Sequence, residues 1–328
     1  MPAPAVGTQS ILGVSAMEAT FGAATAPDRF YPFVDESIKR QNRVLQSQGL
    51  RGGYLPRGGG RRVFTGHSSA GDVSLEVSSK GFSRIFQWIL GGAPTIVQQG
   101  ATTAYLHTHS MGSLVGKSAN VQKQLKDAAS TPVGTFTNRG VKVTNAEFNI
   151  VTDGILALKL GLDGREERSD VAAVAASYVT DNLFHFQQAT LTVAGASQTQ
   201  VSSASVKIDN NLNVDRRHLG NTGLKSEQVD DGFRMVSGSF NADFDSTTLY
   251  ALYAADTAAA LVLEFTGPLI ASTFFEKLTI TVPEVHLTGD TPTVGGPGLI
   301  TYDLPFEAAF DGTLSPITLA LTTTDVAV

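Results

Sequence analysis

The sequence predicts a mainly β fold, a β-sandwich or barrel core with long projecting hairpins and one or two short flanking α-helices. Charged residues make up only 16% of the 328 residues and glycines number 33, a balance that favours strands and turns. Apolar and polar residues alternate in 72–79 and in "FEKLTITVPEV", which is the period of a half-buried strand. Asp153-Gly154, set between two long arms, is a strong hairpin signal.

The helical elements come from 3.6-residue spacing. A short amphipathic helix is predicted over roughly 35–47, stopped by Gly49, so that 35–65 forms a helix plus a basic Gly/Arg-rich loop. "KGFSRIFQWILGG" predicts a second helix with Trp88 off its apolar stripe and two glycines ending it. Briefer helical patterns occur in "NVQKQLKDAA" and "STTLYALYAAD". No repeat or linker divides the chain, so we expect a single domain over 1–328, with 112–133 as a Lys-rich, helical insert whose role the sequence does not define.

Two hairpins dominate the middle of the chain. The arms of 140–167 should each span roughly 35–40 Å, longer than a compact domain needs, so we expect this hairpin to project. A second hairpin, 189–212, is rich in Thr, Ser and Ala and nearly uncharged in its strands. Unpaired edges of such ribbons invite another chain, so we expect them to pair with a neighbouring subunit.

Charge is distributed unevenly along the chain. From residue 235 onward there are eleven Asp and Glu against one base, Lys277, whereas 37–62 holds seven bases and no acid. One end can therefore attract the other, within a subunit or between subunits. The absence of cysteine excludes disulfides and Cys-based metal sites and fits assembly in a reducing cytoplasm. No stretch reads as a signal peptide or as a membrane span.

Several motifs suggest chemistry but lack a necessary part. "GHSSAG" places Ser68 as a hydrolase nucleophile, yet the closing glycine is Ala70 and a strand follows instead of a helix. "GSLVGKS" (112–118) is one residue short of a phosphate-binding loop. "RGGYLPRGGGRR" could bind nucleic acid, but a basic loop that docks on an acidic protein surface fits this acidic chain better.

His107 and His109 in "AYLHTHS" would share one face of a strand and could form half of a zinc site. A third ligand is missing nearby, since the other four histidines stand alone. The alternative is that both mark a wet or subunit-facing side of the core sheet. We therefore predict no metal, no cofactor and no enzymatic activity.

Several passages, in order along most of the chain, resemble the tail tube (major tail) proteins of long-tailed bacteriophages, in their siphophage-like branch. They are "EATFGAATAPDRFYPFVDESIK", "GFSRIFQWILGG", "GVKVTNAEFNIVTDGILALKLGLDGRE", "SVKIDNNL" and "KLTITVPEVHLTGDTPTVGGPGLITYDLPFEAAFD". The resemblance implies a structural virion protein of which six copies form a ring, with rings stacked into the tube that conducts genomic DNA. It also implies contacts with tail tip or baseplate, terminator and tape measure proteins, non-specific contact with double-stranded DNA, assembly in the host cytoplasm and a place in the virion tail.

Residues expected between subunits are those of the basic loop and the hairpin turn: Arg51, Arg57, Arg61, Arg62, Asp153 and Gly154. The sequence assigns no residue to the lumen of such a tube. The alternatives are a carbohydrate-binding β-sandwich, for which the single Trp offers a poor platform, another virion or baseplate protein, and a hydrolase acting through Ser68.

Overall fold

The computed structural model describes residues 3–50, 52–53 and 56–328. The chain is mainly β, which confirms the predicted fold class. The described part contains two short α-helices, α1 (Phe82–Leu90) and α2 (Thr248–Ala254), and the 3₁₀ turns Gly59–Arg61 and Phe186–Gln188. None of the helices in the described ranges is long and apolar enough to cross a membrane.

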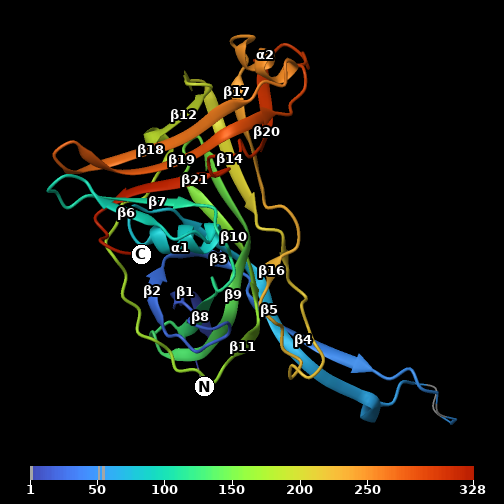
Figure 1. The fold of residues 1–328 in the computed structure, drawn as a ribbon. Coiled ribbons are helices and arrows are strands. Elements are labelled where there is room, and N and C mark those ends of the chain that lie inside the picture. Colours follow the sequence, from blue (N-terminus) through green and yellow to red (C-terminus); the bar gives the residue numbers. More distant parts are fainter. Residues whose placement is uncertain (1–2, 51, 54–55) are drawn as a thin grey trace.

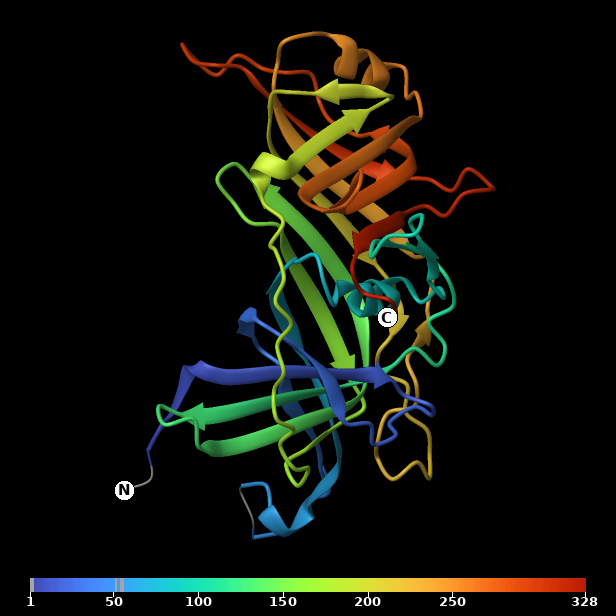
Figure 2. The same ribbon diagram turned by 90° about the vertical axis from the view of Figure 1, so that its left-hand side faces the viewer.

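The strands form two sheets that share one long strand, β9 (Pro132–Val151) (Figures 1 and 2). The first half of β9 belongs to the smaller sheet, with order β2–β1–β8–β9–β11, and its second half pairs with β10 and β14 of the larger sheet. The smaller sheet contains β1 (Ala5–Met17), β2 (Pro27–Tyr31), β8 (Ala119–Asp127) and β11 (Glu166–Arg168). The larger sheet contains β3 (Phe33–Glu36), β4 (Lys39–Gln46), β5 (Arg62–Glu76), β6 (Thr95–Gln98), β7 (Tyr105–Ser110), β10 (Ala157–Gly164), β12 (Ala189–Val193), β13 (Ala196–Gln198), β14 (Val201–Asp209), β17 (Met235–Asp243), β18 (Ala259–Ala271), β19 (Phe274–Leu287), β20 (Thr301–Ala308) and β21 (Thr318–Thr323).

The larger sheet runs β4–β5–β10–β9–β14–β17–β20–β19–β18–β12–β13, with β3 beside the inner part of β5. The strands β21, β7 and β6 extend it from β19. A short separate pair, β15 (Leu212–Asn213) and β16 (Val229–Asp230), brackets a long loop. Antiparallel pairing throughout lets one side of each strand face the core and the other face water.

Helix α1 lies inside the core. Its predicted span is confirmed, and Gly91 ends it in the left-handed conformation with φ of 81°. Trp88, which lies off the predicted apolar stripe, is buried as well, and its indole Nε1 donates to Val141 O at 3.1 Å. Phe86 packs against Phe148 of β9 with ring centroids 5.9 Å apart. The helix therefore fills the space between β7 and β9.

The helix predicted over 35–47 is wrong. The segment forms β3 and β4, and β4 pairs antiparallel with β5 from Lys39 opposite Ala70 to Gln46 opposite Arg62. Nearly all β4 side chains are exposed, so no helical face is buried to favour a helix. The basic loop is thus the tip of a β-ribbon, not the end of a helix.

The helical insert predicted within 112–133 is also wrong, because its main element is β8, the strand between β1 and β9. The strand was not predicted because two polar residues, Gln122 and Gln124, occupy buried positions in it. Gln122 Nε2 donates to Ala172 O at 3.0 Å, and Gln124 Nε2 donates to Val174 O at 2.6 Å. These amides satisfy the backbone of an extended segment that crosses the sheet, which is why polar residues occupy buried strand positions. The helix predicted in "STTLYALYAAD" is confirmed as α2.

The hairpin within 140–167 is present as β9–β10, and Asp153 turns the chain with φ of 61°. It does not project as expected, because β5 pairs with β10 on one side and β14 pairs with β9 on the other. The second predicted hairpin is instead three strands: β12 pairs with β13 and β18, while β14 pairs with β9 and β17. The element that projects is the β4–β5 ribbon (Figure 1).

Candidate assembly surfaces

One side of six adjacent strands, β5, β10, β9, β14, β17 and β20, carries small polar and acidic side chains. Directly opposite residues of neighbouring strands point to the same side, so the register assigns each residue to a side. We call this side the polar face. It contains Asp72, Ser74, Glu76, Ala157, Lys159, Gly161, Asn145, Glu147, Asn149, Val151, Ser203, Ser205, Lys207, Asp209, Met235, Ser237, Ser239, Asn241, Asp243, Thr301, Asp303, Pro305 and Glu307.

The other side of the same strands is the core. Leu75, Leu158 and Phe148 stand opposite one another in register, and their neighbours in β14 and β20 are Val206 and Phe306. All five are at most 2% exposed. On the polar face, by contrast, every residue except Gly161 is half-buried or exposed. The alternation of buried and exposed residues therefore separates a dry side from a wet side across six strands, of which the sequence predicted it in β5, β9 and β10.

The polar face is acidic. Its carboxylates are Asp72, Glu76, Glu147, Asp209, Asp243, Asp303 and Glu307, whereas its bases are Lys159 and Lys207. Both lysines lie directly opposite Glu147, one on each neighbouring strand. Lys159 Nζ is also 3.3 Å from Asp72 Oδ2. Each positive charge on this face thus has a carboxylate beside it, and the surface as a whole repels anions.

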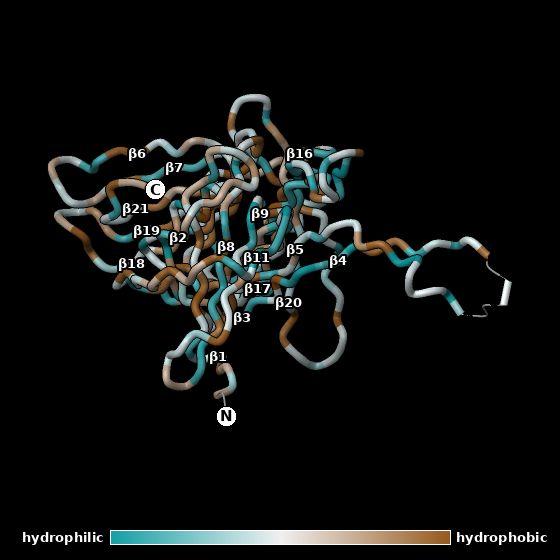
Figure 3. The backbone as a smooth tube through the Cα atoms, turned by 90° about the horizontal axis from the view of Figure 1, so that it is seen from below, coloured by the Kyte–Doolittle hydropathy of each residue, from teal (hydrophilic) through white to brown (hydrophobic). Residues whose placement is uncertain are grey.

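The ribbon of β4 and the outer part of β5, together with the loop that joins them, is the second candidate surface, and we call it the arm (Figures 1 and 3). Arg57, Arg61 and Arg62 are exposed at its tip. Arg51, also predicted between subunits, lies outside the described residues. Asp153 and Gly154 lie away from the arm, at the β9–β10 turn, and Asp153 is exposed. The structure therefore separates the predicted residues into a basic tip and a distant turn.

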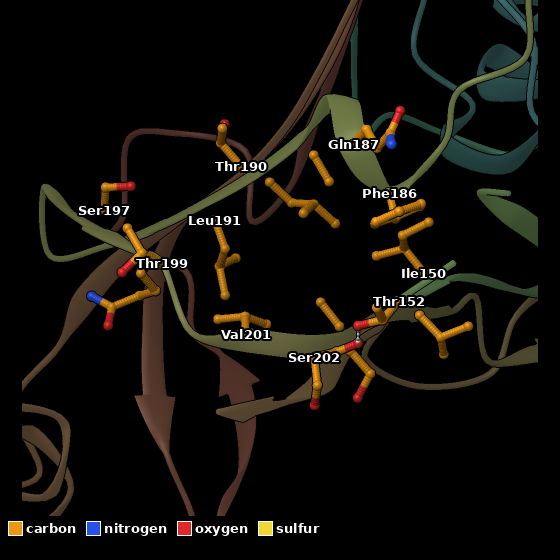
Figure 4. A pocket seen from close by; sticks show the side chains of 16 residues that line it. Ile150, Thr152, Phe186, Gln187, Thr190, Leu191, Ser197, Thr199, Val201 and Ser202 are labelled. Carbon is orange, nitrogen blue, oxygen red and sulfur yellow. Dashed lines mark hydrogen bonds between the residues drawn. The ribbon is translucent and has the colours of Figure 1, made fainter. Parts of the chain in front are cut away.

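A groove of about 410 Å³ adjoins the β9–β10 turn (Figure 4). It opens where the larger sheet fails to close between β12 and β14, and Phe186, Leu191, Ile150 and Val201 point into it among Thr and Ser side chains. Most of its residues come from the second predicted hairpin region and from the turn, and Phe186, Gln187 and Leu263 complete the lining. The structure places no charged side chain among those that line it.

A loop that was not predicted from the sequence contacts the root of the arm and one end of strands β9 and β10. We call residues 214–234 the strap. Lys225 Nζ is 2.5 Å from Asp163 Oδ1, and Lys142 Nζ is 2.7 Å from Glu227 Oε1. Asp163 lies on the same side of β10 as Lys159, so this pair fastens the strap over the continuation of the polar face. Burial lowers the pKa of Lys142 and raises that of Asp163.

The strap also touches the arm. Asp215 Oδ1 is 3.2 Å from Arg43 of β4 and 3.0 Å from Arg217. At Gly66 of β5 the backbones approach so closely that a Cβ on Gly223 would lie 1.6 Å from Thr65 O. The register of β4 with β5 also shifts at this point, between Arg43 and the next residue. The sequence signal was weak, because charged residues in a non-periodic segment are typical of any solvated loop.

His107 and His109 are fully buried on β7 and point at α1, which corrects the expectation of a wet or subunit-facing position. His107 Nε2 donates to Asp325 O at 2.8 Å, so its Nδ1 accepts from Ser83 Oγ at 2.7 Å. His109 Nε2 then donates to Ser83 Oγ at 2.9 Å. Burial, with His107 as a lesser cause, lowers the pKa of His109 to about 3. Within the described ranges no three metal-ligating side chains cluster.

The other motifs are absorbed into the fold. Ser68 is buried in the middle of β5 and not on a strand-to-helix turn. In 112–118 the amide of Gly116 donates to a carboxylate oxygen of Glu227, so an acid of this chain occupies the position a phosphate would take. Trp88 is in the core and offers no sugar platform.

An extended sheet with a broad polar face and a projecting basic arm, and with His107 and His109 held in the core, defines the class of β-rich structural proteins. Residues 7–308 match the model of the phage tail tube protein family, so the chain belongs to that family. It is a bacteriophage protein and a structural component of the virion tail. No curated protein is significantly similar to it.

Proposed function

We propose that six copies of this protein form a ring, that rings stack into a tail tube, and that the polar face lines the lumen through which genomic DNA leaves the capsid. The observation that carries the lumen assignment is the composition of the polar face. Across six strands it offers Ser and Asn side chains and carboxylates, with both of its lysines beside Glu147.

A DNA conduit must not hold its cargo. Double-stranded DNA carries one negative charge per about 1.7 Å of axis, and each cationic contact would add affinity by releasing counterions. Carboxylates repel phosphates within a Debye length of about 8–10 Å at physiological salt. Short hydroxyl and amide side chains on a sheet also offer no long or cationic groups that would bind a moving duplex. The polar face meets both requirements.

Ring stacking would use opposite charges on one chain. The arm tip presents Arg57, Arg61 and Arg62, and the chain from residue 235 onward holds eleven acids and one base. We infer that the tip of a subunit in one ring meets the acidic region of a subunit in the next, and that the turn at Asp153-Gly154 contributes to a contact between subunits. The tube would end on tail tip or baseplate and terminator proteins, surround the tape measure protein and then DNA, and assemble in the host cytoplasm.

The first test is negative-stain electron microscopy of the purified, concentrated protein, alongside its mass in solution. Hollow tubes of stacked rings are the expected result. The triple variant R57E/R61E/R62E should keep the fold and lose stacking, whereas normal tubes from it would overturn the charge argument. Replacing Lys126 of β8 by Glu changes one charge elsewhere and serves as the control.

The lumen assignment has its own test. Replacing Ser205 and Ser239, which are opposite one another on the polar face, by lysine should leave tube assembly intact and make the tubes retain DNA, with a retention that falls as salt rises. The matched double variant to Asn keeps the face neutral and should retain none. Equal DNA release by the lysine variant would show that this face is not the lumen.

A further inference from the structure

The outer part of the arm is a two-stranded ribbon. β5 pairs with both β4 and β10 at Ser69 and Ala70, but from His67 outward to Arg62 it pairs with β4 alone. A two-stranded ribbon is marginally stable by itself in water, since it lacks a third strand or a packed face. The arm therefore needs a partner to hold it in a single conformation.

Each face of this ribbon carries an exposed apolar pair of residues. Val44 stands opposite Phe64 and Leu45 opposite Val63, so one pair points to each face. Leu45 is 59% exposed, Val63 58% and Phe64 54%. Figure 3 shows the resulting hydrophobic band across the arm, between its root and its polar tip. In the six strands of the polar face, by contrast, one side of the sheet is apolar and the other is mainly polar.

This arrangement constrains how the arm can be bound. A ribbon that lies flat on a single surface buries one face and leaves the other in water, for which a polar outer face would suffice. Apolar residues on both faces of a ribbon are expected where both faces are buried in the assembled state. The ribbon must then enter a crevice with a wall on each side.

We propose, on the basis of the stacked-ring function proposed above, that the arm inserts between two neighbouring copies of this chain in the adjacent ring, with Val44 and Phe64 against one copy and Leu45 and Val63 against the other. Charge complementarity identifies the partner as this chain. The tip beyond the band is basic, and the described acids of the C-terminal third have Lys277 as their one base. Each arm thus joins two subunits of the next ring.

The experiment compares the two faces. V44S/F64S removes one apolar face and L45S/V63S removes the other, while Q48S changes an exposed polar residue of the same arm as a control. Thermal unfolding of the unassembled subunits verifies that the fold is retained. We expect both double variants to lose tube formation and Q48S to keep it. If only one double variant fails, the arm lies on a single surface and the proposal is wrong.

A second readout does not depend on the variants blocking assembly. The chain has no cysteine, so L45C and F64C each introduce a unique thiol, one on each face. Maleimide should label both in free subunits and neither in tubes; labelling of one position in tubes overturns the two-sided insertion. If the unaltered protein forms no tubes or rings at all, the failure lies with the proposed function and not with the arrangement of the arm.

Discussion

The buried pair that fastens the strap allows a quantitative prediction. The Lys225 and Asp163 side chains are only 6% and 7% exposed. Asp163 also accepts from Gln228 Nε2 at 2.8 Å. Replacing Lys225 by Met would leave a buried carboxylate without its cation, a change that typically costs about 3–5 kcal/mol. The strap has no apolar cluster to compensate for it.

The penalty has an upper limit set by protonation. Burial already raises the pKa of Asp163, and removal of Lys225 raises it further. From an unfolded pKa near 3.9, taking up a proton costs about 4 kcal/mol at pH 7 and about 1.5 kcal/mol at pH 5. The folded variant binds more protons than its unfolded state, so its stability falls as pH rises from about 4 toward the folded pKa.

Urea unfolding of the unassembled subunit, followed by the fluorescence of the single tryptophan, Trp88, measures both numbers. We expect K225M to lose about 3–4 kcal/mol at pH 7 and about 1–2 kcal/mol at pH 5. The double variant K225M/D163L should recover most of the loss, because Gln228 Nε2 keeps its bond to Asp163 O at 2.9 Å. A loss below about 1 kcal/mol, or one equal at both pH values, would mean that water reaches the pair and the reasoning fails.

Two further predictions concern the core and the root of the arm. Because the folded pKa of His109 is about 3, below its unfolded value near 6.5, the unfolded state binds more protons between these values and stability should fall as pH drops through this range. H109L should flatten the pH dependence of urea midpoints there, and an unchanged slope would contradict the assignment. Gly223→Ala would place its Cβ 1.6 Å from Thr65 O at a φ of +77°, so we expect a loss of about 1–3 kcal/mol and a displaced arm. Hydrogen exchange of Thr65 and Gly66 tests this, and unaltered protection would show that the strap does not support the arm.

Helix α1 and the β9–β10 hairpin could be predicted because a single sequence pattern determines each of them. Phe82, Ile85 and Phe86 recur at helical spacing and the helix ends at a glycine, so α1 was found. The Asp153-Gly154 turn located the β9–β10 hairpin. The errors occur where a strand breaks the simple alternation. In β4 the adjacent apolar residues Val44 and Leu45 point to opposite faces of the arm, and this pattern resembles a helix more than a half-buried strand.

The polar face, unlike the basic tip of the arm, could not be predicted from the sequence, for a different reason. The polar face joins strands as far apart in the chain as β5 and β20, and a shift of any one of them by a single residue would turn its polar side chains into the core. Alternation in the sequence predicts that each strand has an apolar and a polar side. It does not predict which strands are neighbours, and therefore which polar sides form one surface. The buried histidines show the converse, since pairing with Ser83 and a backbone carbonyl made polar residues suitable for the core.

The two surfaces are parts of one strand. β5 carries Val63 and Phe64 in the arm and Asp72 and Glu76 on the polar face, and the strap contacts it between them, at Gly66. In the proposed tube, the outer end of β5 would lie between two copies of the chain in the next ring. The inner end of β5 would form part of the lumen wall of its own ring. A force on the stacking contact would then pass along a hydrogen-bonded strand into the lumen wall. Because one strand, β5, forms both the lumen wall of one ring and the contact with the next ring, neighbouring rings would be joined through it. The strap would fix the angle between the lumen wall and the arm.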